Sequence, residues 1–139
     1  MTEEIVASVP VAGGDRLLPG RLVLCYSVSD PVAVRLEYRG RHWYIARYLL
    51  TDVLSDRVTD RAGDGVSLVR ATRMPGDQLL LVLRDGCARW LLRVCAEQVG
   101  EWLCGTYLAC PPWEEQRAVE RELQVHLDMV ASTTRQEGR

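Results

Sequence analysis

Five cysteines and two histidines are the side chains of this chain best suited to hold a metal ion or to act as nucleophiles. They are Cys25, Cys87, Cys95, Cys104, Cys110, His42 and His126. Zinc sites usually contain closely spaced cysteine pairs, and no CxxC pair occurs here. An odd number of cysteines in a chain without export signals predicts free thiols in a reducing compartment. We therefore expect the cysteines to be small apolar residues of the core, with no disulfide and no bound metal.

The hydroxyl residues show no sequence context for nucleophilic catalysis. Ser55 and Ser67 lie outside any GxSxG pattern, and the two histidines are far apart in the chain, which gives no basis for a triad. All 17 basic residues are arginine. A Schiff-base lysine and a P-loop of the GxxxxGK[ST] type are therefore excluded. We predict a protein that is not an enzyme and uses no cofactor.

Length and composition predict one domain. The chain has 139 residues, of which 47% are hydrophobic and 26% charged, which is enough for one compact core and too little for two ordinary domains. We expect a single domain over residues 1–139, with its core at about 18–130 and a short flexible C-terminal tail. No window approaches the roughly 20 apolar residues of a membrane span, and the acidic start lacks a signal peptide's basic region. A cytoplasmic location follows.

Hydrophobic periodicity predicts four strands and a helix in the first half, with strands at 4–9, 21–28, 32–38 and 42–46 and the helix at 47–54. In the third strand Val34, Leu36 and Tyr38 alternate with charged residues, as expected when one sheet face is buried. Arg39-Gly40 reads as the turn of a hairpin. The polar run 60–65 is expected to be a mobile loop.

The second half repeats this order. Strands are expected at 66–72, 78–84 and 87–94, separated by turn signals at Pro75-Gly76 and Asp85-Gly86. The run 79–83 is apolar throughout, which suggests a central strand covered on both faces. A helix near 95–107 should end at Pro111-Pro112, where a second helix reaching about residue 130 can begin. Strands followed by a helix, twice over, indicate an α+β domain.

One ordered pattern covers Leu24 to Leu50. It reads LxYxxxDPxAV, from Leu24 through Asp30-Pro31, and then WxxARxLL, from Trp43 onwards. This order resembles the SsgA-like proteins, small actinobacterial regulators of sporulation-specific cell division. Shorter matches follow at 63–66, 95–103 and 111–114. The steps at 68–70 and 84–86 differ from the usual family pattern, so the chain resembles a divergent member.

The resemblance carries expectations for fold and function. It implies a Whirly-like fold of two antiparallel β-sheets with packed helices, about seven strands and three helices, assembled as a trimer. It also implies a regulator or adaptor of septum placement and divisome recruitment that acts by protein–protein interaction at the division septum. The partners implied are the tubulin-like division protein FtsZ or its recruiters, or the peptidoglycan machinery. The use of arginine alone and the absence of Phe are typical of a GC-rich genome, which fits an actinobacterial source.

Three residues of the matching motifs are candidates for a partner surface: Asp30, Arg47 and Trp113. A purely structural interpretation makes Asp30 a turn former, while Arg47 either caps the strand-to-helix junction or pairs with Asp30 or Asp52. Trp113 follows two prolines at an expected helix start, where it would stay partly exposed, as an interface anchor does. The other tryptophans share the periodicity of aliphatic neighbours and are expected in the core. They are Trp43, Trp90 and Trp102.

The last helix carries a narrow apolar stripe among charged residues, formed by Val119, Leu123, Leu127 and Val130. A narrow stripe packs against one surface only, either the chain's own sheet or a neighbouring subunit. The trimer implied by the resemblance favours a neighbouring subunit. We therefore treat these four residues as a candidate oligomer interface.

A single-stranded nucleic-acid-binding regulator is the alternative function, because the Whirly-like proteins implied by the resemblance bind such strands. Arg35, Arg39 and Arg41 lie near one hairpin, and Arg89 and Arg93 alternate on another strand. The net charge of −2 argues against it, since nucleic-acid sites usually carry a clustered basic excess. The chain contains few aromatic residues for base stacking. Protein–protein interaction remains the preferred function.

Overall fold

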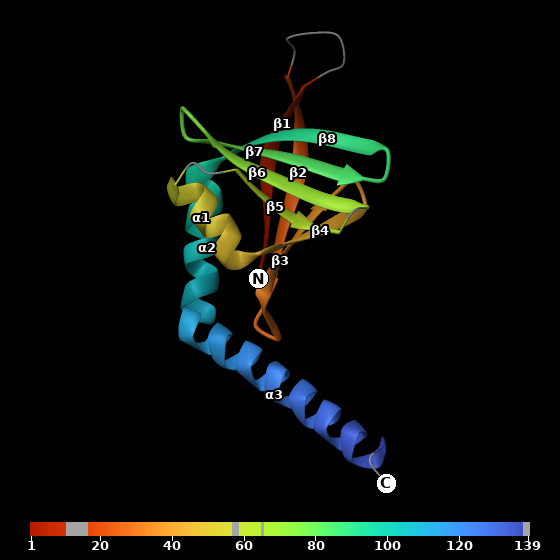
Figure 1. Ribbon diagram of the computed structural model, residues 1–139. Coiled ribbons are helices and arrows are strands. Elements are labelled where there is room, and N and C mark those ends of the chain that lie inside the picture. The colour runs from red at the N-terminus through yellow and green to blue at the C-terminus, as the bar shows by residue number, and fades with distance from the viewer. Residues whose placement is uncertain (11–16, 57–58, 65, 138–139) are drawn as a thin grey trace.

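The computed structural model describes residues 1–10, 17–56, 59–64 and 66–137 (Figure 1). Two successions of four strands and one helix make up most of this part of the chain. The first contains β1 (Thr2–Pro10), β2 (Leu17–Ser27), β3 (Asp30–Tyr38), β4 (Arg41–Ala46) and α1 (Arg47–Asp56). The second contains β5 (Thr59–Gly63), β6 (Ser67–Met74), β7 (Gln78–Asp85), β8 (Ala88–Cys95) and α2 (Ala96–Ala109). A long helix, α3 (Pro112–Glu137), follows.

The β3–β4 hairpin shows how local sequence sets this architecture. Tyr38 pairs with Arg41, so Arg39 and Gly40 alone form the turn. Their φ angles of 51° and 74° are both positive, as a two-residue turn of type I′ requires. Gly40 adopts such an angle without steric cost. The turn predicted from sequence is therefore confirmed.

The strands form one antiparallel sheet in the order β4-β3-β2-β1-β8-β7-β6-β5. The halves β1–β4 and β5–β8 join where β1 pairs with β8. In this ladder Ser8 lies opposite Arg93. The two end strands, β4 and β5, also contact each other, so the sheet is nearly closed. The expectation of two sheets with about seven strands is wrong, because the β1–β8 junction unites the halves into one eight-stranded sheet. The three expected helices are confirmed.

The eighth strand is β5, where the sequence predicts a mobile loop at 60–65. Within the described part of that run, 60–63 is strand, paired along β6 from Thr59–Thr72 to Gly63–Leu68. Residue 65 lies outside the described residues. The polar composition of β5 is misleading because it is the end strand of the sheet order, where one edge of the strand needs no ladder partner.

The core fills the inside of the nearly closed sheet. Inward positions of β7, namely Leu79, Leu81 and Leu83, are fully buried, whereas Leu80 and Val82 between them are only half-buried. The expectation that residues 79–83 are covered on both faces is therefore wrong. The outer face of β7 stays accessible because α1 and α2 leave it uncovered.

Some of the tryptophans and cysteines expected in the core are buried, and others are not. Trp43 and Trp102 are buried. Trp90 is half-buried and packs edge-on against Tyr38 and Trp43. Of the five cysteines, Cys110 is buried, Cys25 is half-buried, and Cys87, Cys95 and Cys104 are exposed. The prediction of core cysteines is wrong for these last three, which lie in a turn, at an outward strand position and on an exposed helix face.

Helix α3 leaves the rest of the molecule at an angle and projects beyond the sheet (Figure 1). Pro112 is its first residue, a position that suits proline because no intrahelical partner for the N–H is needed there. The helix continues to Glu137, past the expected end of the core near residue 130. Every residue from 119 to 133 is exposed.

Leu36→Ala and Arg35→Ala test the register of β3. Leu36 is 1% exposed and points into the core, so its truncation should lower the free energy of unfolding by about 2 to 5 kcal/mol. Arg35 faces solvent and pairs with Glu37 at 2.8 Å, an exposed contact worth about 0 to 1 kcal/mol. Urea denaturation measures both values. Equal losses would show that the register is wrong.

Candidate functional site

Arg47, the first residue of α1, has a fully buried side chain. Its Nη1 donates hydrogen bonds to the carbonyl oxygens of Thr106, at 3.1 Å, and Cys110, at 2.8 Å. Its Nη2 donates to Oε2 of Glu115, at 2.7 Å, in the first turn of α3. Carbonyls at the end of a helix carry partial negative charge, and the Thr106 oxygen also accepts the backbone N–H of Cys110. One guanidinium therefore joins the start of α1, the end of α2 and the start of α3.

Two aromatic rings flank the same guanidinium. The Arg47 Cζ atom lies 4.8 Å from the ring centroid of Tyr26 and 4.1 Å from that of Tyr107. Such cation–π contacts are strongest where water is excluded. We call Arg47, Tyr26, Tyr107 and Glu115 the Arg47 cluster. Within the described residues, the Nε of Arg47 has no hydrogen-bond acceptor.

Tyr26 connects the cluster to the Asp30-Pro31 motif. Its hydroxyl donates to the carbonyl oxygen of Pro31 at 3.1 Å. Burial raises the pKa of Tyr26 above its ordinary value, so the phenol remains a neutral donor at physiological pH. The LxYxxxDP and WxxARxLL patterns therefore meet in space. Tyr26, Pro31 and Arg47 belong to one structural arrangement, which gives these motif residues a physical role.

The three candidate partner residues have different surroundings. Arg47 pairs with Glu115 rather than with Asp30 or Asp52, and its burial leaves it inside the fold instead of on an exposed surface. Trp113 is 57% exposed, with the Arg117 guanidinium 5.6 Å from its ring centroid. Its expected exposure is confirmed. The three side chains do not form one site.

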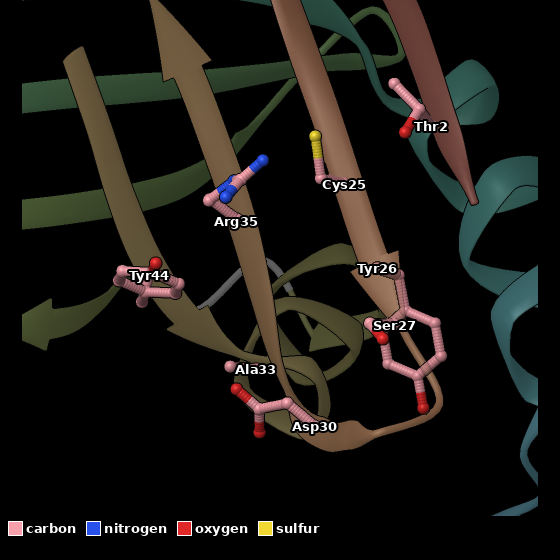
Figure 2. Close-up of a pocket in the computed structure, with 8 residues that line it drawn as sticks. All are labelled: Thr2, Cys25, Tyr26, Ser27, Asp30, Ala33, Arg35 and Tyr44. Carbon is pink, nitrogen blue, oxygen red and sulfur yellow. The ribbon is translucent and has the colours of Figure 1, made fainter.

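Asp30 is exposed and lines a depression on the outer face of the first half (Figure 2). The turn before it is held by Ser27, whose Oγ accepts the backbone N–H of Ser29 at 3.3 Å and pairs with the Ser29 hydroxyl at 2.7 Å. Arg35 lines the same depression but is paired with Glu37. Asp30 therefore lies at an accessible strand start, five positions along β3 from the paired Arg35.

Glu115 was not among the sequence candidates. The available signal was its position three residues after Pro112, which places a carboxylate in the first turn of a helix that begins at proline. The sequence does not show that Arg47, at the start of another helix, provides its partner. That contact depends on the corner between α2 and α3, where the N–H groups of Glu114 and Glu115 donate to the carbonyl of Pro111.

The exposed part of α3 carries the predicted stripe. Val119, Leu123, Leu127 and Val130 are 46%, 57%, 51% and 49% exposed, so the stripe is not buried against the chain's own sheet. The described residues contain no group of three or more His, Cys, Asp or Glu side chains that could hold a metal ion. The accessible features of this part of the chain are thus a projecting helix and outer sheet faces.

A model of the family described as "Streptomyces sporulation and cell division protein, SsgA" matches residues 21–115. The chain belongs to this family. The matched range contains both ends of the Arg47–Glu115 contact and the motifs that meet at Tyr26. The resemblance expected from the sequence is therefore confirmed.

Two solved structures have the same fold as this member of the SsgA family. One was reported with mutations in SsgB that correlate with longitudinal cell division during sporulation of Streptomyces coelicolor. It is 27% identical, with a TM-score of 0.64, over 83% of this chain and 90% of that one. The other is an SsgA-like sporulation-specific cell division protein from Thermobifida fusca. It is 21% identical, with a TM-score of 0.65, over 92% and 94% of the two chains, and supports the fold alone.

A curated relative of a different kind matches a shorter region. It is the L-cysteine:1D-myo-inositol 2-amino-2-deoxy-alpha-D-glucopyranoside ligase of Acidothermus cellulolyticus, 41% identical over 66 residues. That region is 47% of this chain, and the chain spans 16% of the ligase's length. Such partial coverage gives no basis for transferring the ligase activity. Among the helices described, none is long and apolar enough to cross a membrane.

Arg47→Met should destabilise the protein strongly. The substitution leaves Glu115, whose side chain is 13% exposed, without its cation, and removes the guanidinium donor from the Cys110 and Thr106 carbonyls, of which Thr106 keeps the backbone N–H of Cys110. Removing one partner of a buried pair costs about 3 to 5 kcal/mol. Arg47→Lys should recover little, because an ammonium lacks the planar fork that serves three acceptors.

Urea denaturation with Arg121→Met as the control measures this effect. Arg121 is exposed on α3, so its replacement should change the unfolding free energy by about 0.5 kcal/mol or less. A similarly small change for Arg47→Met would contradict the structural role of the cluster.

Proposed function

We propose that this protein is a non-enzymatic regulator of sporulation-specific cell division that acts as an adaptor. The description of its family names sporulation and cell division. The observation that carries the adaptor role is α3, exposed at every position from 119 to 133 and fixed at its base by the buried Arg47–Glu115 pair. A rigidly anchored helix with an exposed apolar stripe is suited to binding another protein.

The partners we propose are septal proteins: FtsZ or its recruiters, or components of the peptidoglycan machinery. We place the protein at the division septum, where an adaptor for these partners would act. We also propose a homo-oligomer, with a trimer favoured, whose interface includes the stripe on α3. Trp113 and Asp30, which are both exposed, are the proposed partner contacts outside that stripe.

Single-stranded nucleic acid is the second candidate ligand, favoured by the arginines on the outer sheet faces. Two of the arginines considered from sequence are already neutralised, because Arg35 pairs with Glu37 and Arg41 with Asp85. Arg89 and Arg93 are exposed on β8. The net charge of −2 opposes a long polyanion. Oligonucleotide binding with a steep salt dependence would favour this alternative.

Replacing Leu123 and Leu127 together with Ser tests the proposed interface. Both side chains are more than half exposed, so the monomer core loses nothing. We expect a folded protein of lower mass in light scattering, because the stripe would supply most of the association energy. The matched control replaces Val125 and Met129 with Ser, which removes exposed apolar area from another side of the same helix.

Unchanged mass in the Leu123/Leu127 variant, or an equal loss in the control, would move the interface elsewhere. Unfolding of the variant would place the stripe in the monomer core.

A fluorescent fusion expressed in sporulating hyphae tests the cellular role. We expect ladders of fluorescence at sporulation septa for the wild-type fusion, since an adaptor must be present where it recruits. Diffuse fluorescence throughout sporulation, at an expression level that supports normal spores, would contradict the septal role.

A further inference from the structure

The outer face of β6, β7 and β8 is a basic surface with an apolar centre. Side chains alternate along each strand, so inward residues are buried and the residues between them face solvent. The exposed basic residues are Arg70, Arg84, Arg89 and Arg93, and the half-buried apolar residues among them are Leu68, Leu80, Val82 and Leu91. We call these eight residues the arginine face.

The register brings like charges together on this face. Arg84 lies directly opposite Arg89. Like charges at opposed positions destabilise a sheet. Every residue of β6, β7 and β8 is described, and none of their outward positions carries a carboxylate. The acceptor that Arg84 reaches is the carbonyl of Gly86, at 3.2 Å. An acidic ligand would offset this repulsion.

The same chain exposes a surface of complementary character on α3. At about 100° of rotation per residue, Glu120 and Glu122 fall on the two sides of the Val119, Leu123, Leu127, Val130 stripe. Both glutamates are exposed. The chain therefore carries an apolar stripe bordered by carboxylates on α3 and, on a separate part of the molecule, an apolar centre bordered by arginines.

We propose that the arginine face is the docking site for α3 of a second copy of this chain. The inference rests on the proposed role of the α3 stripe in assembly and names the surface that receives it. Leu123 and Leu127 would cover the apolar centre, and Glu120 and Glu122 would pair with the surrounding arginines. Guanidinium groups suit this task because they bind carboxylates through two parallel hydrogen bonds.

The dimensions of the two surfaces agree. From Val119 to Val130 the helix rises by about 17 Å, at roughly 1.5 Å per residue. The arginine face lies on β6, β7 and β8, and together with the neighbouring β5 these strands span about 14 Å at roughly 4.8 Å per interval. A helix lying across these four strands can therefore keep most of its stripe in contact with them.

A second copy fits this face better than the chain's own helix or a nucleic acid. In Figure 1, α3 runs away from the β5–β8 half to which the face belongs. The outward positions of β6, β7 and β8 include no aromatic ring on which bases could stack. Because helix and face are different surfaces, the contact is head-to-tail, and closure of such contacts produces a ring.

Charge reversal tests the docking. Light scattering and sedimentation equilibrium would compare the wild type with R70E/R89E, with E120R/E122R, and with the quadruple variant. Each double variant places like charges in contact and should raise the concentration at which the oligomer dissociates at least about tenfold. The quadruple variant restores opposite charges in exchanged positions and should recover the wild-type mass. R121E, on the far side of α3 from the stripe, is the control and should leave the mass unchanged.

The outcomes separate this inference from the proposed function. Dissociation by the Leu123/Leu127 double Ser substitution, with no effect of either charge reversal, would keep α3 as the interface and overturn its docking on the arginine face. Failure of the quadruple variant to recover mass, while circular dichroism shows it folded, would also overturn it. So would loss of single-stranded DNA binding in R70E/R89E without a change in mass, which would assign the face to nucleic acid.

Discussion

The buried guanidinium of Arg47 is the interaction on which the arrangement of the helices depends. A buried charge is costly unless its donors are satisfied and an opposite charge lies close by. Glu115 supplies the charge, while Thr106 and Cys110 supply carbonyl acceptors from the end of α2. These groups come from three helices, so the cost of burial is offset only when α1, α2 and α3 are placed together. Because the buried Arg47 must be paired with Glu115, the cluster fixes the direction in which α3 leaves the molecule.

That direction sets α3 apart from the sheet. The nearly closed sheet places its aliphatic residues inside, and the strands present arginines and half-buried aliphatic residues to solvent. Helix α3 extends its apolar stripe away from this body (Figure 1). In this member of the SsgA family, the projecting helix and the outer sheet face are the two surfaces on which the proposed function relies. The proposed assembly and the proposed partner binding then use different faces of this fold.

Much of the fold could be predicted because its signals are local. The alternation of Val34, Leu36 and Tyr38 predicts β3, and Arg39-Gly40 predicts the turn after it. Strand β5 could not be predicted in this way, because its polar residues become a strand only by pairing with β6. The motifs around Tyr26 and Arg47 identified the family. The Arg47–Glu115 pair could not be predicted, because it depends on the corner after Pro111, and the spacing of the two residues in the sequence does not show that they lie close together. The outer face of β7 was misjudged because its apolar run does not show which side the helices leave uncovered.

Amide hydrogen exchange in Glu115→Ala and Glu114→Ala tests the central claim most directly. The two residues occupy the same helical turn, so both substitutions remove one carboxylate from the helix N-terminus and alter its dipole interaction alike. Only Glu115 pairs with Arg47 in the structure. If Arg47 fixes the base of α3, amides of residues 116–120 should exchange markedly faster in Glu115→Ala than in Glu114→Ala, while β7 keeps its protection. Equal exchange in the two variants would contradict the claim.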